Sequence, residues 1–253
     1  NDGNLEIVIG SPNFNYDTNN YEGFVSVIKN DGSNMEGWPF ELDSERAFFS
    51  TPAIGDMDND GSKEIAICNR IDQKLYVINS NGIIHNGWPI NAGCIDGDPA
   101  FADLNGDGNL EVLVGGLGFN EGFFIFSAFD SGGIAISGWP KIITRTYGGA
   151  FGKGMIGPVI ADLDNDGYKE IVAVEEYPDF SFSSIDSLPR IHIWNSDGSD
   201  VEGWPKIIYP TKSPPILTDF SEDGNLNLIL ASQNKIFIYN LNIPYNPNAM
   251  DWP

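Results

Sequence analysis

Residues 157–174 have the sequence GPVIADLDNDGYKEIVAV, in which an acidic loop separates two apolar runs. Asp162, Asp164 and Asp166 alternate in the loop, and Glu170 follows after Gly167. The runs are short and rich in Val and Ile, which is typical of β-strands. Oxygen ligands at positions 1, 3, 5 and 9, a backbone carbonyl at position 7 and a glycine at position 6 suit Ca²⁺. The stretch therefore predicts a strand, a calcium loop and a second strand.

The same loop recurs along the chain, and such repeats decide a fold before local propensities do. Its fifth position falls at residues 2, 60, 107, 166 and 223, so the interval is roughly 47–59 residues. We expect one Ca²⁺ in each of up to four complete loops, with the weakest binding in the last, which has the fewest carboxylates. The predicted ligands, in which the seventh residue offers its backbone carbonyl, are Asp56, Asp58, Asp60, Ser62 and Glu64; Asp103, Asn105, Asp107, Asn109 and Glu111; Asp162, Asp164, Asp166, Tyr168 and Glu170; and Asp219, Ser221, Asp223, Asn225 and Asn227.

The triplet Gly-Trp-Pro is a second repeated marker and falls between the acidic loops. It places tryptophan at Trp38, Trp88, Trp139 and Trp204, and residues 251–253 echo it as Asp-Trp-Pro. A strand-like run closed by a turn of Asn, Asp and Gly precedes each triplet, as tight hairpins require. Because tryptophan recurs at one fixed place in every repeat, we expect it to pack between adjacent repeats and not to serve as a ligand platform.

Each repeat therefore contains four short strands, which predicts an all-β fold: a β-propeller built of four-stranded antiparallel blades. We expect one domain, residues 1–253, with about five blades. The approximate repeats are residues 1–51, 52–98, 99–157, 158–214 and 215–253. Residues 1–6 resemble the second half of an acidic loop, and the last repeat stops at Trp-Pro. We therefore expect a portion of a longer chain and of a larger propeller, with about six to eight blades.

Composition excludes several function classes. The formal net charge is −23, with 36 acidic residues against 13 basic ones, which argues against binding to a phosphate backbone. No apolar run approaches the ~20 residues that span a membrane, so direct membrane insertion is not expected. Cys68 and Cys94 are the only cysteines. They are either two small apolar residues on strands or a single bridge between neighbouring blades.

At this point the chain resembles the FG-GAP (VCBS-type) repeats of integrin α-subunit propellers and many secreted bacterial proteins. The likeness is carried by Phe151-Gly152, by Gly157-Pro158-Val159 and by the acidic loop at residues 161–170. The other repeats keep the proline and the loop but lack the Phe-Gly pair, and glutamate replaces the family's aspartate at position 9. The resemblance implies Ca²⁺ in each loop and a domain that works outside the cytoplasm, secreted or on the cell surface.

Catalytic patterns are sparse. GxSxG, HExxH and CxxC spacings are absent from the sequence, and we expect both histidines, His85 and His192, at half-buried strand or hairpin positions. Loop carboxylates that bind Ca²⁺ stay ionised and so cannot serve as general acids. The alternative function is a polysaccharide lyase of the rhamnogalacturonan-lyase type. The basic groups available to it are Arg46, Arg145, Lys153, Arg190 and His192.

The end of each blade opposite the acidic loops carries the segments that vary in length, of which residues 175–190 are the longest. Exposed aromatic residues on variable loops are common in recognition surfaces, although several of these could instead fold back over the blade ends. The candidates are Tyr16, Tyr21, Phe119, Tyr147, Tyr177, Phe180 and Phe182. We therefore predict a calcium-stabilised extracellular scaffold or interaction module that is not an enzyme. Its partner is a protein or a glycan, and further domains of the same chain are possible.

Overall fold

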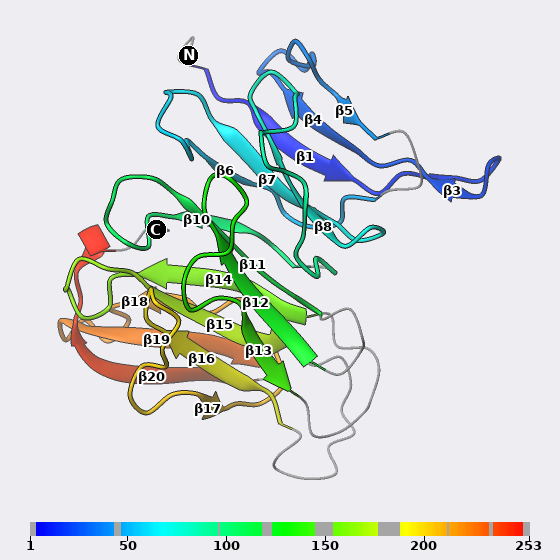
Figure 1. Ribbon diagram of the computed structural model, residues 1–253. Coiled ribbons are helices and arrows are strands. Elements are labelled where there is room, and N and C mark those ends of the chain that lie inside the picture. Colours follow the sequence, from blue (N-terminus) through cyan, green and yellow to red (C-terminus); the bar gives the residue numbers. More distant parts are fainter. Residues whose placement is uncertain are drawn as a thin grey trace.

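The computed structural model describes residues 4–42, 47–95, 97–117, 123–144, 154–176, 188–211, 213–232 and 235–249. Within these residues the protein is all-β, as predicted, apart from one turn of 3-10 helix, η2 (Pro247–Ala249) (Figure 1). The strands form five successive sheets and one small ribbon. No helix in the described part of the chain is long and apolar enough to span a membrane.

Three of the five sheets have four strands, and the first and fifth have three within the described residues. The first sheet contains β1 (Ile7–Ser11), β4 (Phe24–Ile28) and β5 (Phe40–Glu41). The second contains β6 (Ala53–Gly55), β7 (Glu64–Asn69), β8 (Lys74–Ile78) and β9 (Ile90–Asn91). The third contains β10 (Ala100–Ala102), β11 (Glu111–Leu117), β12 (Phe123–Phe129) and β13 (Lys141–Thr144).

The fourth sheet contains β14 (Gly154–Ala161), β15 (Glu170–Glu176), β16 (Arg190–Trp194) and β17 (Lys206–Ile207). The fifth contains β18 (Ile216–Thr218), β19 (Asn225–Ser232) and β20 (Lys235–Pro244), and the ribbon pairs β2 (Phe14–Asn15) with β3 (Asn20–Tyr21). All pairings within the described sheets are antiparallel, and apart from β1 with β4, which the β2–β3 ribbon separates, they join consecutive strands. The prediction of four-stranded antiparallel sheets is therefore confirmed for the second, third and fourth.

Apolar residues on both faces of each second strand explain why the sheets stack. Successive side chains in a strand point to opposite faces. In β7, Ile65 and Ile67 belong to the core layer shared with the first sheet, whereas Ala66 and Cys68 belong to the layer shared with the third. Two further core layers join the third to the fourth sheet and the fourth to the fifth. The second, third and fourth sheets thus each bury one face against the sheet before and the other against the sheet after, whereas the first and fifth each bury one face.

The Gly-Trp-Pro tryptophans pack between sheets, as predicted, in the first three repeats. Trp38, Trp88 and Trp139 are each only 7% exposed. Their indole Nε1–H groups donate to the carbonyl oxygens of Ser80, Ser131 and Ser196, each at 3.0 Å. Each acceptor lies in the hairpin turn of the next sheet. A buried indole needs such a partner for its N–H, and the bond joins neighbouring sheets at their outer strands.

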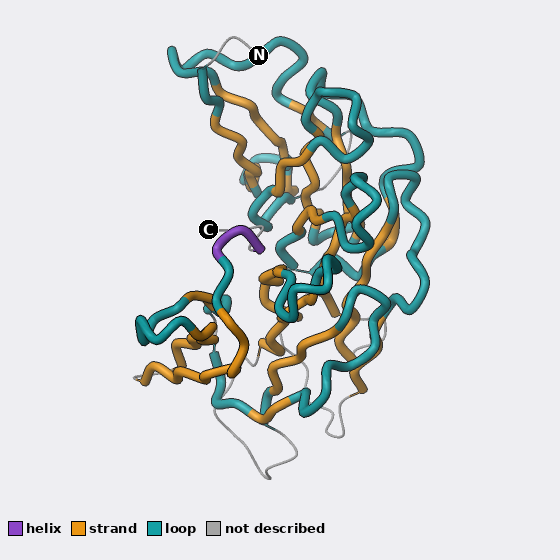
Figure 2. The backbone as a smooth tube through the Cα atoms, turned by 90° about the vertical axis from the view of Figure 1, so that its left-hand side faces the viewer, coloured by secondary structure: helices purple, strands orange, loops and turns teal. Residues whose placement is uncertain are grey.

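The row of sheets is curved, and η2 lies on its concave side (Figure 2). Cys68 and Cys94 form a disulfide. The bridge joins β7 to the segment after β9, so it closes one repeat on itself and does not join neighbouring repeats, contrary to the bridged alternative that the sequence left open. The loop between β15 and β16 is also shorter than predicted. Residues 175 and 176 belong to β15 because its pairing with β14 extends to Gly154↔Glu176.

Candidate metal centres

The four acidic loops join the first and second strands of the second to fifth sheets, and they lie on the left in Figure 1. Strand pairing fixes the two ends of each loop. In the first loop, residues 56–64, Gly55 pairs with Glu64 across β6 and β7. Position 4 of this loop, Asn59, and position 6, Gly61, have φ angles of 57° and 87°. Asparagine and glycine tolerate this left-handed conformation, and it curls the loop around its own carboxylates.

In the first loop, Asp56, Asp58 and Glu64 each bring a carboxylate oxygen within 4.8 Å of the others. Glu64 is buried, and its Oε2 accepts a hydrogen bond of 2.9 Å from the backbone N–H of Met57. Asp56 accepts from Gly61 N–H through Oδ2 at 3.1 Å. Its other oxygen, Oδ1, is buried without a hydrogen-bond partner. A buried carboxylate oxygen without a donor is costly, and a cation at the centre of these carboxylates would satisfy it.

The third loop, residues 162–170, has the same arrangement. Asp162, Asp164 and Glu170 form the second group of three carboxylates within 4.8 Å in the described part of the chain. Glu170 accepts a 2.7 Å hydrogen bond from Leu163 N–H, as Glu64 does from Met57. Gly167 N–H donates to Asp162 at 3.1 Å. One oxygen of the glutamate at position 9 therefore accepts a hydrogen bond from the loop backbone, and the other is left for the carboxylate cluster.

The carboxylates at position 5 stand slightly apart from these groups. Asp60 and Asp166 each turn one oxygen toward the backbone N–H of position 7, at 2.7 Å from Ser62 and 2.8 Å from Tyr168. Both lie outside the closest groups of three. Each keeps a second oxygen that a bound cation could take. The phenol ring of Tyr168 is 49% exposed, and only its backbone is a predicted ligand.

The second loop replaces one carboxylate with an amide. Asn105 Nδ2 donates to Asp107 at 3.2 Å and to Glu111 at 3.4 Å. Asp58 and Asp164 hold the same position in the first and third loops and offer carboxylate oxygens, whereas Asn105 presents amide N–H groups. Turned over, the same side chain would offer its carbonyl oxygen, since the two ends of an amide are interchangeable in shape. Asp103 accepts from Gly108 N–H at 2.9 Å and Asn109 N–H donates to Asp107 at 2.8 Å, as in the other loops.

The fourth loop is held mainly by its own hydrogen bonds. Asn227 occupies position 9 and accepts from both the backbone N–H and the hydroxyl of Ser221, at 3.0 and 3.1 Å. Asp219 accepts from Gly224 at 2.9 Å, and Asn225 N–H donates to Asp223 at 2.9 Å. The Nδ2 of Asn227 is buried without a partner. This amide donor offers a cation nothing, so the fourth loop is the poorest cation site of the four.

The glutamates at position 9 of the first three loops have raised pKa values. Burial raises the pKa of Glu64 and of Glu111, and it raises the pKa of Glu170 to about 7. In each case hydrogen bonding from the loop backbone opposes the shift, and the neighbouring aspartates add to it. A buried carboxyl among other carboxylates favours the neutral form unless a positive charge is present. Ca²⁺ would supply that charge, and the all-oxygen donor sets of the first and third loops fit it.

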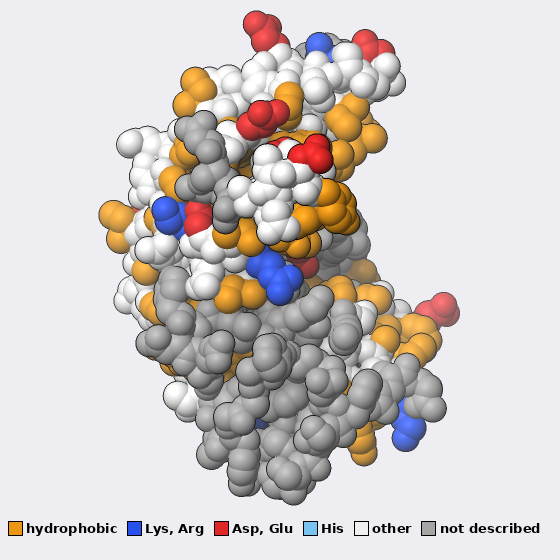
Figure 3. Space-filling model, turned by 90° about the vertical axis from the view of Figure 1, so that its right-hand side faces the viewer, with side chains coloured by type: hydrophobic (Ala, Val, Ile, Leu, Met, Phe, Trp, Pro, Cys, Tyr) orange, Lys and Arg blue, Asp and Glu red, His pale blue; other side chains and the backbone are white. Residues whose placement is uncertain are grey.

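Of the predicted recognition residues, the described part of the chain contains Tyr16 and Tyr21. Tyr16 is 88% exposed beside the β2–β3 ribbon, whereas Tyr21 packs against Phe14 and Phe49, with ring centroids 4.9 and 6.0 Å apart. Tyr16 is thus available at the surface, and Tyr21 is half-buried against these two rings. The remaining candidates lie outside the described residues: Phe119, Tyr147, Tyr177, Phe180 and Phe182. Figure 3 shows the side of the molecule that is on the right in Figure 1, where hydrophobic and charged side chains are mixed over the first sheets.

A buried polar cluster in the fourth sheet was missed from the sequence. Glu175 and His192 are each 5% exposed and approach within 2.9 Å, from Oε1 to Nε2. Glu175 Oε2 accepts from Arg190 N–H at 3.1 Å, and the His192 ring stacks on Trp194 at 4.9 Å between centroids. His192 was predicted to be half-buried but is buried, because β15 continues past the expected strand end. Arg46, Arg145 and Lys153, the other lyase candidates, lie outside the described residues.

Comparison with known proteins agrees with the repeat pattern. Residues 56–114 match the model of the FG-GAP-like repeat family. No match to this chain was found among curated proteins. Its structure is similar to the PilY1 C-terminal domain of Pseudomonas aeruginosa, with a TM-score of 0.55 and 14% identity over 90% of this chain and 52% of that one.

A second solved structure, the V. cholerae biofilm matrix protein Bap1, aligns with a TM-score of 0.40 and 18% identity over 86% of this chain and 42% of that one. The chain thus spans about half or less of the length of these two structures. The likeness to the PilY1 domain is one of fold alone, and the resemblance to the FG-GAP-like repeat family depends on the sequence match at residues 56–114. The predicted resemblance is thereby confirmed: this chain carries an FG-GAP-like repeat, matched at residues 56–114.

Proposed function

We propose that this chain is a portion of a calcium-stabilised β-propeller that acts outside the cell as a non-catalytic scaffold or interaction module. The observation that carries the proposal is the repetition of one acidic loop, at the same place, in four successive sheets. A catalytic site is needed once in a protein, whereas a cation site that stabilises the connection between two strands is useful in every repeat. The partner is a protein or a glycan, and Tyr16 is the described residue that we assign to its surface.

The end sheets support the assignment to a larger propeller. Ile7 and Ile9 of the first sheet are 62% and 40% exposed, whereas Ile65 and Ile67, at the same positions of the second sheet, are 3% and 0% exposed. At the other end, the outward-facing Ile236 of β20 is 70% exposed. Large apolar surfaces are rarely left open in soluble proteins. We infer that further blades cover both faces, in addition to the approximate blades 1–51, 52–98, 99–157, 158–214 and 215–253.

The Cys68–Cys94 disulfide supports an extracellular location, because disulfides persist in oxidising compartments. Extracellular calcium-binding modules have dissociation constants of roughly 10⁻⁴–10⁻³ M, and extracellular fluids supply Ca²⁺ at concentrations that suit them. Secretion or surface display is therefore part of the proposal. The Gly-Trp-Pro and acidic-loop repeats would then form a rigid frame, and recognition would fall to the loops at the opposite end of the sheets.

Calcium binding is tested by removing the metal. We expect chelation to lower the melting temperature by several degrees, because a ligand that binds only the folded state adds stability by mass action. Thermal melts after exhaustive chelation, followed by addition of Ca²⁺ or of Mg²⁺, measure this effect. Equilibrium dialysis gives the number of ions bound. Asp56→Asn and Asp162→Asn should each remove one strong site, and Asp219→Asn is the matched control in the weakest loop. Identical melts, with bound metal shown to be absent, would refute the calcium proposal.

A further inference from the structure

The first and second acidic loops are joined by the side chain at position 4 of the first loop. Asn59 Nδ2 donates to the backbone carbonyl of Gly108 and, at 3.2 Å, to the side-chain oxygen of Asn109. These two residues are positions 6 and 7 of the second loop. Gly108 N–H donates to Asp103 at 2.9 Å. Asn109 N–H donates to Asp107 at 2.8 Å. Asn59 therefore holds the part of the second loop that orients two of its carboxylates.

A backbone hydrogen bond joins the same two loops. Leu110 N–H, next to Glu111 in the chain, donates to the Met57 carbonyl at 3.4 Å. Met57 in turn donates its own N–H to Glu64 at 2.9 Å. The glutamates at position 9 of the two loops are therefore linked by a short path through Met57 and Leu110.

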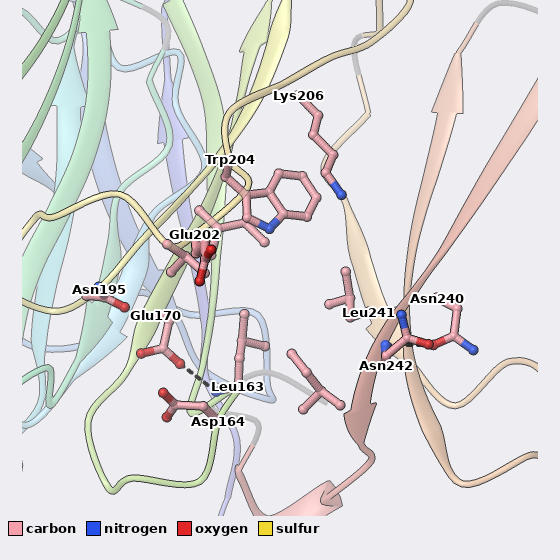
Figure 4. Close-up of a pocket in the computed structure, with 13 residues that line it drawn as sticks. Leu163, Asp164, Glu170, Asn195, Glu202, Trp204, Lys206, Asn240, Leu241 and Asn242 are labelled. Carbon is pink, nitrogen blue, oxygen red and sulfur yellow. Dashed lines mark hydrogen bonds between the residues drawn. The ribbon is translucent and has the colours of Figure 1, made fainter.

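The backbone bond is repeated between the second and third loops. Lys169 N–H donates to the Leu104 carbonyl at 3.4 Å, and Leu104 N–H donates to Glu111 at 2.9 Å. The dashed line in Figure 4 marks the equivalent bond in the third loop, from Leu163 N–H to Glu170 at 2.7 Å. A row of hydrogen bonds thus runs through the three loops that have glutamate at position 9. The backbone bonds of the described residues do not extend this row to the fourth loop.

The side-chain link is confined to the first junction, because position 4 of the second loop is glycine. A methyl group built on Gly106 would lie 3.6 Å from the carbonyl oxygen of Gly167, at position 6 of the third loop. Gly106 thus has the place relative to the third loop that Asn59 has relative to the second. In the third loop, Asn165 at position 4 accepts a hydrogen bond of 2.9 Å from Asn246, which lies outside the loops. The chain therefore contains one loop junction with the amide and one without it.

The position of Asn59 depends on the order of its own loop. Asn59 lies between Asp58 and Asp60, in a loop with four carboxylates in nine residues, and has a φ angle of 57°. Like charges at this spacing repel one another, so the curled form of the loop is favoured when a cation neutralises them. Ordering of the first loop then fixes the amide that holds the second, and the second loop loses less conformational freedom on binding. The second loop gains most from such help, since Asn105 replaces one of its carboxylates.

We propose that the first and second acidic loops bind Ca²⁺ cooperatively, and that Asn59 is the positioning residue that couples them. Binding in the first loop raises the affinity of the second, and by linkage binding in the second raises that of the first by the same factor. The second and third loops have the backbone bond without the amide and are coupled more weakly. This inference rests on the calcium binding of the proposed function, and it adds a dependence between sites that repetition alone does not supply.

The test follows each loop separately through the glycine at position 6. The N–H groups of Gly61, Gly108 and Gly167 donate to the position-1 aspartates of their own loops, at 3.1, 2.9 and 3.1 Å. Ca²⁺ is titrated into the chain of residues 1–253, and the three amide signals are followed in proton–nitrogen correlation spectra. We expect Asp56→Asn, which removes the first site, to raise the Ca²⁺ concentration at the midpoint of the Gly108 transition about fivefold, the factor that one net hydrogen bond supplies.

Substitutions of Asn59 separate coupling from folding. Asn59→Gly removes the amide and tolerates the positive φ angle, and in this background Asp56→Asn should move the Gly108 midpoint less than about twofold. Asn59→Asp keeps the shape of the side chain but has no N–H, so it should uncouple the loops in the same way. Asn165→Gly makes the matched change in the third loop, and the response to Asp56→Asn should persist in it. A merely structural role of Asn59 would lower the melting temperature without changing this dependence of one loop on the other.

The second junction offers a test in the opposite direction. Gly106→Asn supplies the missing amide, and the φ angle of 73° at this position suits asparagine, as 57° does at Asn59. In the parent chain, Asp162→Asn, which removes the third site, should move the Gly108 midpoint less than about twofold. In the Gly106→Asn background the same substitution should move it about fivefold.

The reciprocal measurement guards against a first-loop variant that fails to fold. Asp103→Asn removes the second site, and the Gly61 midpoint should then rise by the same factor, because coupling acts equally in both directions. Gly108 and Gly61 midpoints that ignore the loss of the neighbouring site would overturn the coupling and leave calcium binding intact, as would an Asp56→Asn response that survives Asn59→Gly. No Ca²⁺ response at Gly61, Gly108 or Gly167 would refute the proposed function and the coupling with it.

Discussion

At the scale of the residue, the glutamate at position 9 links the acidic loops to the sheets. Glu64, Glu111 and Glu170 are strand residues that are 2–4% exposed, and each accepts the backbone N–H of position 2 of its own loop. One oxygen thus fixes the shape of the loop, and the other belongs to the carboxylate cluster. Aspartate has one methylene fewer and would reach less far from the strand. This geometry explains how the chain accommodates glutamate where the family pattern has aspartate.

The raised pKa of Glu170 predicts a pH dependence of the stability of the metal-free chain. Its pKa is about 7 in the folded state against an ordinary value of 4.5, so between these values the folded chain holds a proton that the unfolded chain has released. This contribution to stability is complete below pH 4.5 and is lost as the pH rises toward 7. We expect the metal-free melting temperature to fall between pH 5.5 and 7.5, and to fall less in Glu170→Gln.

Melts in chelator at both pH values measure this effect. Saturating Ca²⁺ should reverse the trend, because the ion binds the ionised carboxylate and binds better as the pH rises. Glu6→Gln, an exposed glutamate at the equivalent place in the first sheet, is the control and should leave the slope unchanged. A Glu170→Gln slope equal to that of the parent chain would rule out this carboxyl as the source.

At the scale of the element, the Gly-Trp-Pro segment of each of the first three repeats contacts the hairpin turn of the next sheet and so joins the two sheets. The turn presents carbonyl oxygens at its tip, and the Gly-Trp-Pro segment presents glycine and an indole N–H. Both glycines of the pair have positive φ, for example 87° at Gly138 and 77° at Gly198. Glycine is thus required twice, for the conformation of the backbone and for the close approach of the partner turn.

A matched pair of glycine substitutions separates these two requirements. Gly138 and Gly203 have φ angles of 87° and 84°, so alanine carries nearly the same conformational cost at both. A methyl group on Gly138 meets the carbonyl of Asp197, whereas one on Gly203 meets nothing within 4 Å. We expect Gly138→Ala to lower the free energy of unfolding by at least about 1 kcal/mol more than Gly203→Ala does. Urea denaturation of the two variants measures the difference, and equal losses would show that the contact between Gly138 and the turn at Asp197 does not matter for stability.

At the scale of the whole molecule, the core is a series of layers between sheets and not one central cluster. Four buried layers separate five sheets. Stability in such a stack is approximately a sum of terms for each repeat and for each neighbouring pair. The position of a residue in the row therefore matters as much as its place in the repeat, and the end sheets contribute only one buried face each.

This arrangement predicts different costs for equivalent residues. Ile65 and Ile67 are buried between two sheets, and Ile7 and Ile9 occupy the same positions on the open face of the first sheet. Replacing the buried pair with threonine should cost more than about 3 kcal/mol, because two buried ethyl groups are replaced by two hydroxyls. Replacing the exposed pair should cost less than about 1 kcal/mol. Urea denaturation of the two double variants tests this, and similar losses would show that the face is covered in this chain.

Much of the architecture could be predicted from the sequence because it is local and repeated. Short Val- and Ile-rich runs, turn residues and the interval of the acidic loops sufficed for an all-β fold with four-stranded antiparallel sheets. The fixed recurrence of tryptophan sufficed for its packing between sheets. The grouping of Asp56 with Asp58 and Glu64 also follows from one loop, since all three lie within nine consecutive residues. Each of these features depends on neighbours along the chain.

Other features were decided only by the tertiary structure, because they join residues from different strands or sheets. The Cys68–Cys94 bridge and the Glu175–His192 pair depend on strand register and on where β15 ends. The open space beside Gly203 depends on the next sheet, where the β19–β20 pairing is irregular between Asn225 and Asn227, although the Gly-Trp-Pro triplet is identical to the three that contact a turn. Sequence by itself determined what each repeat is. Whether its surfaces are occupied depends on the packing of its neighbours, which no repeat encodes alone.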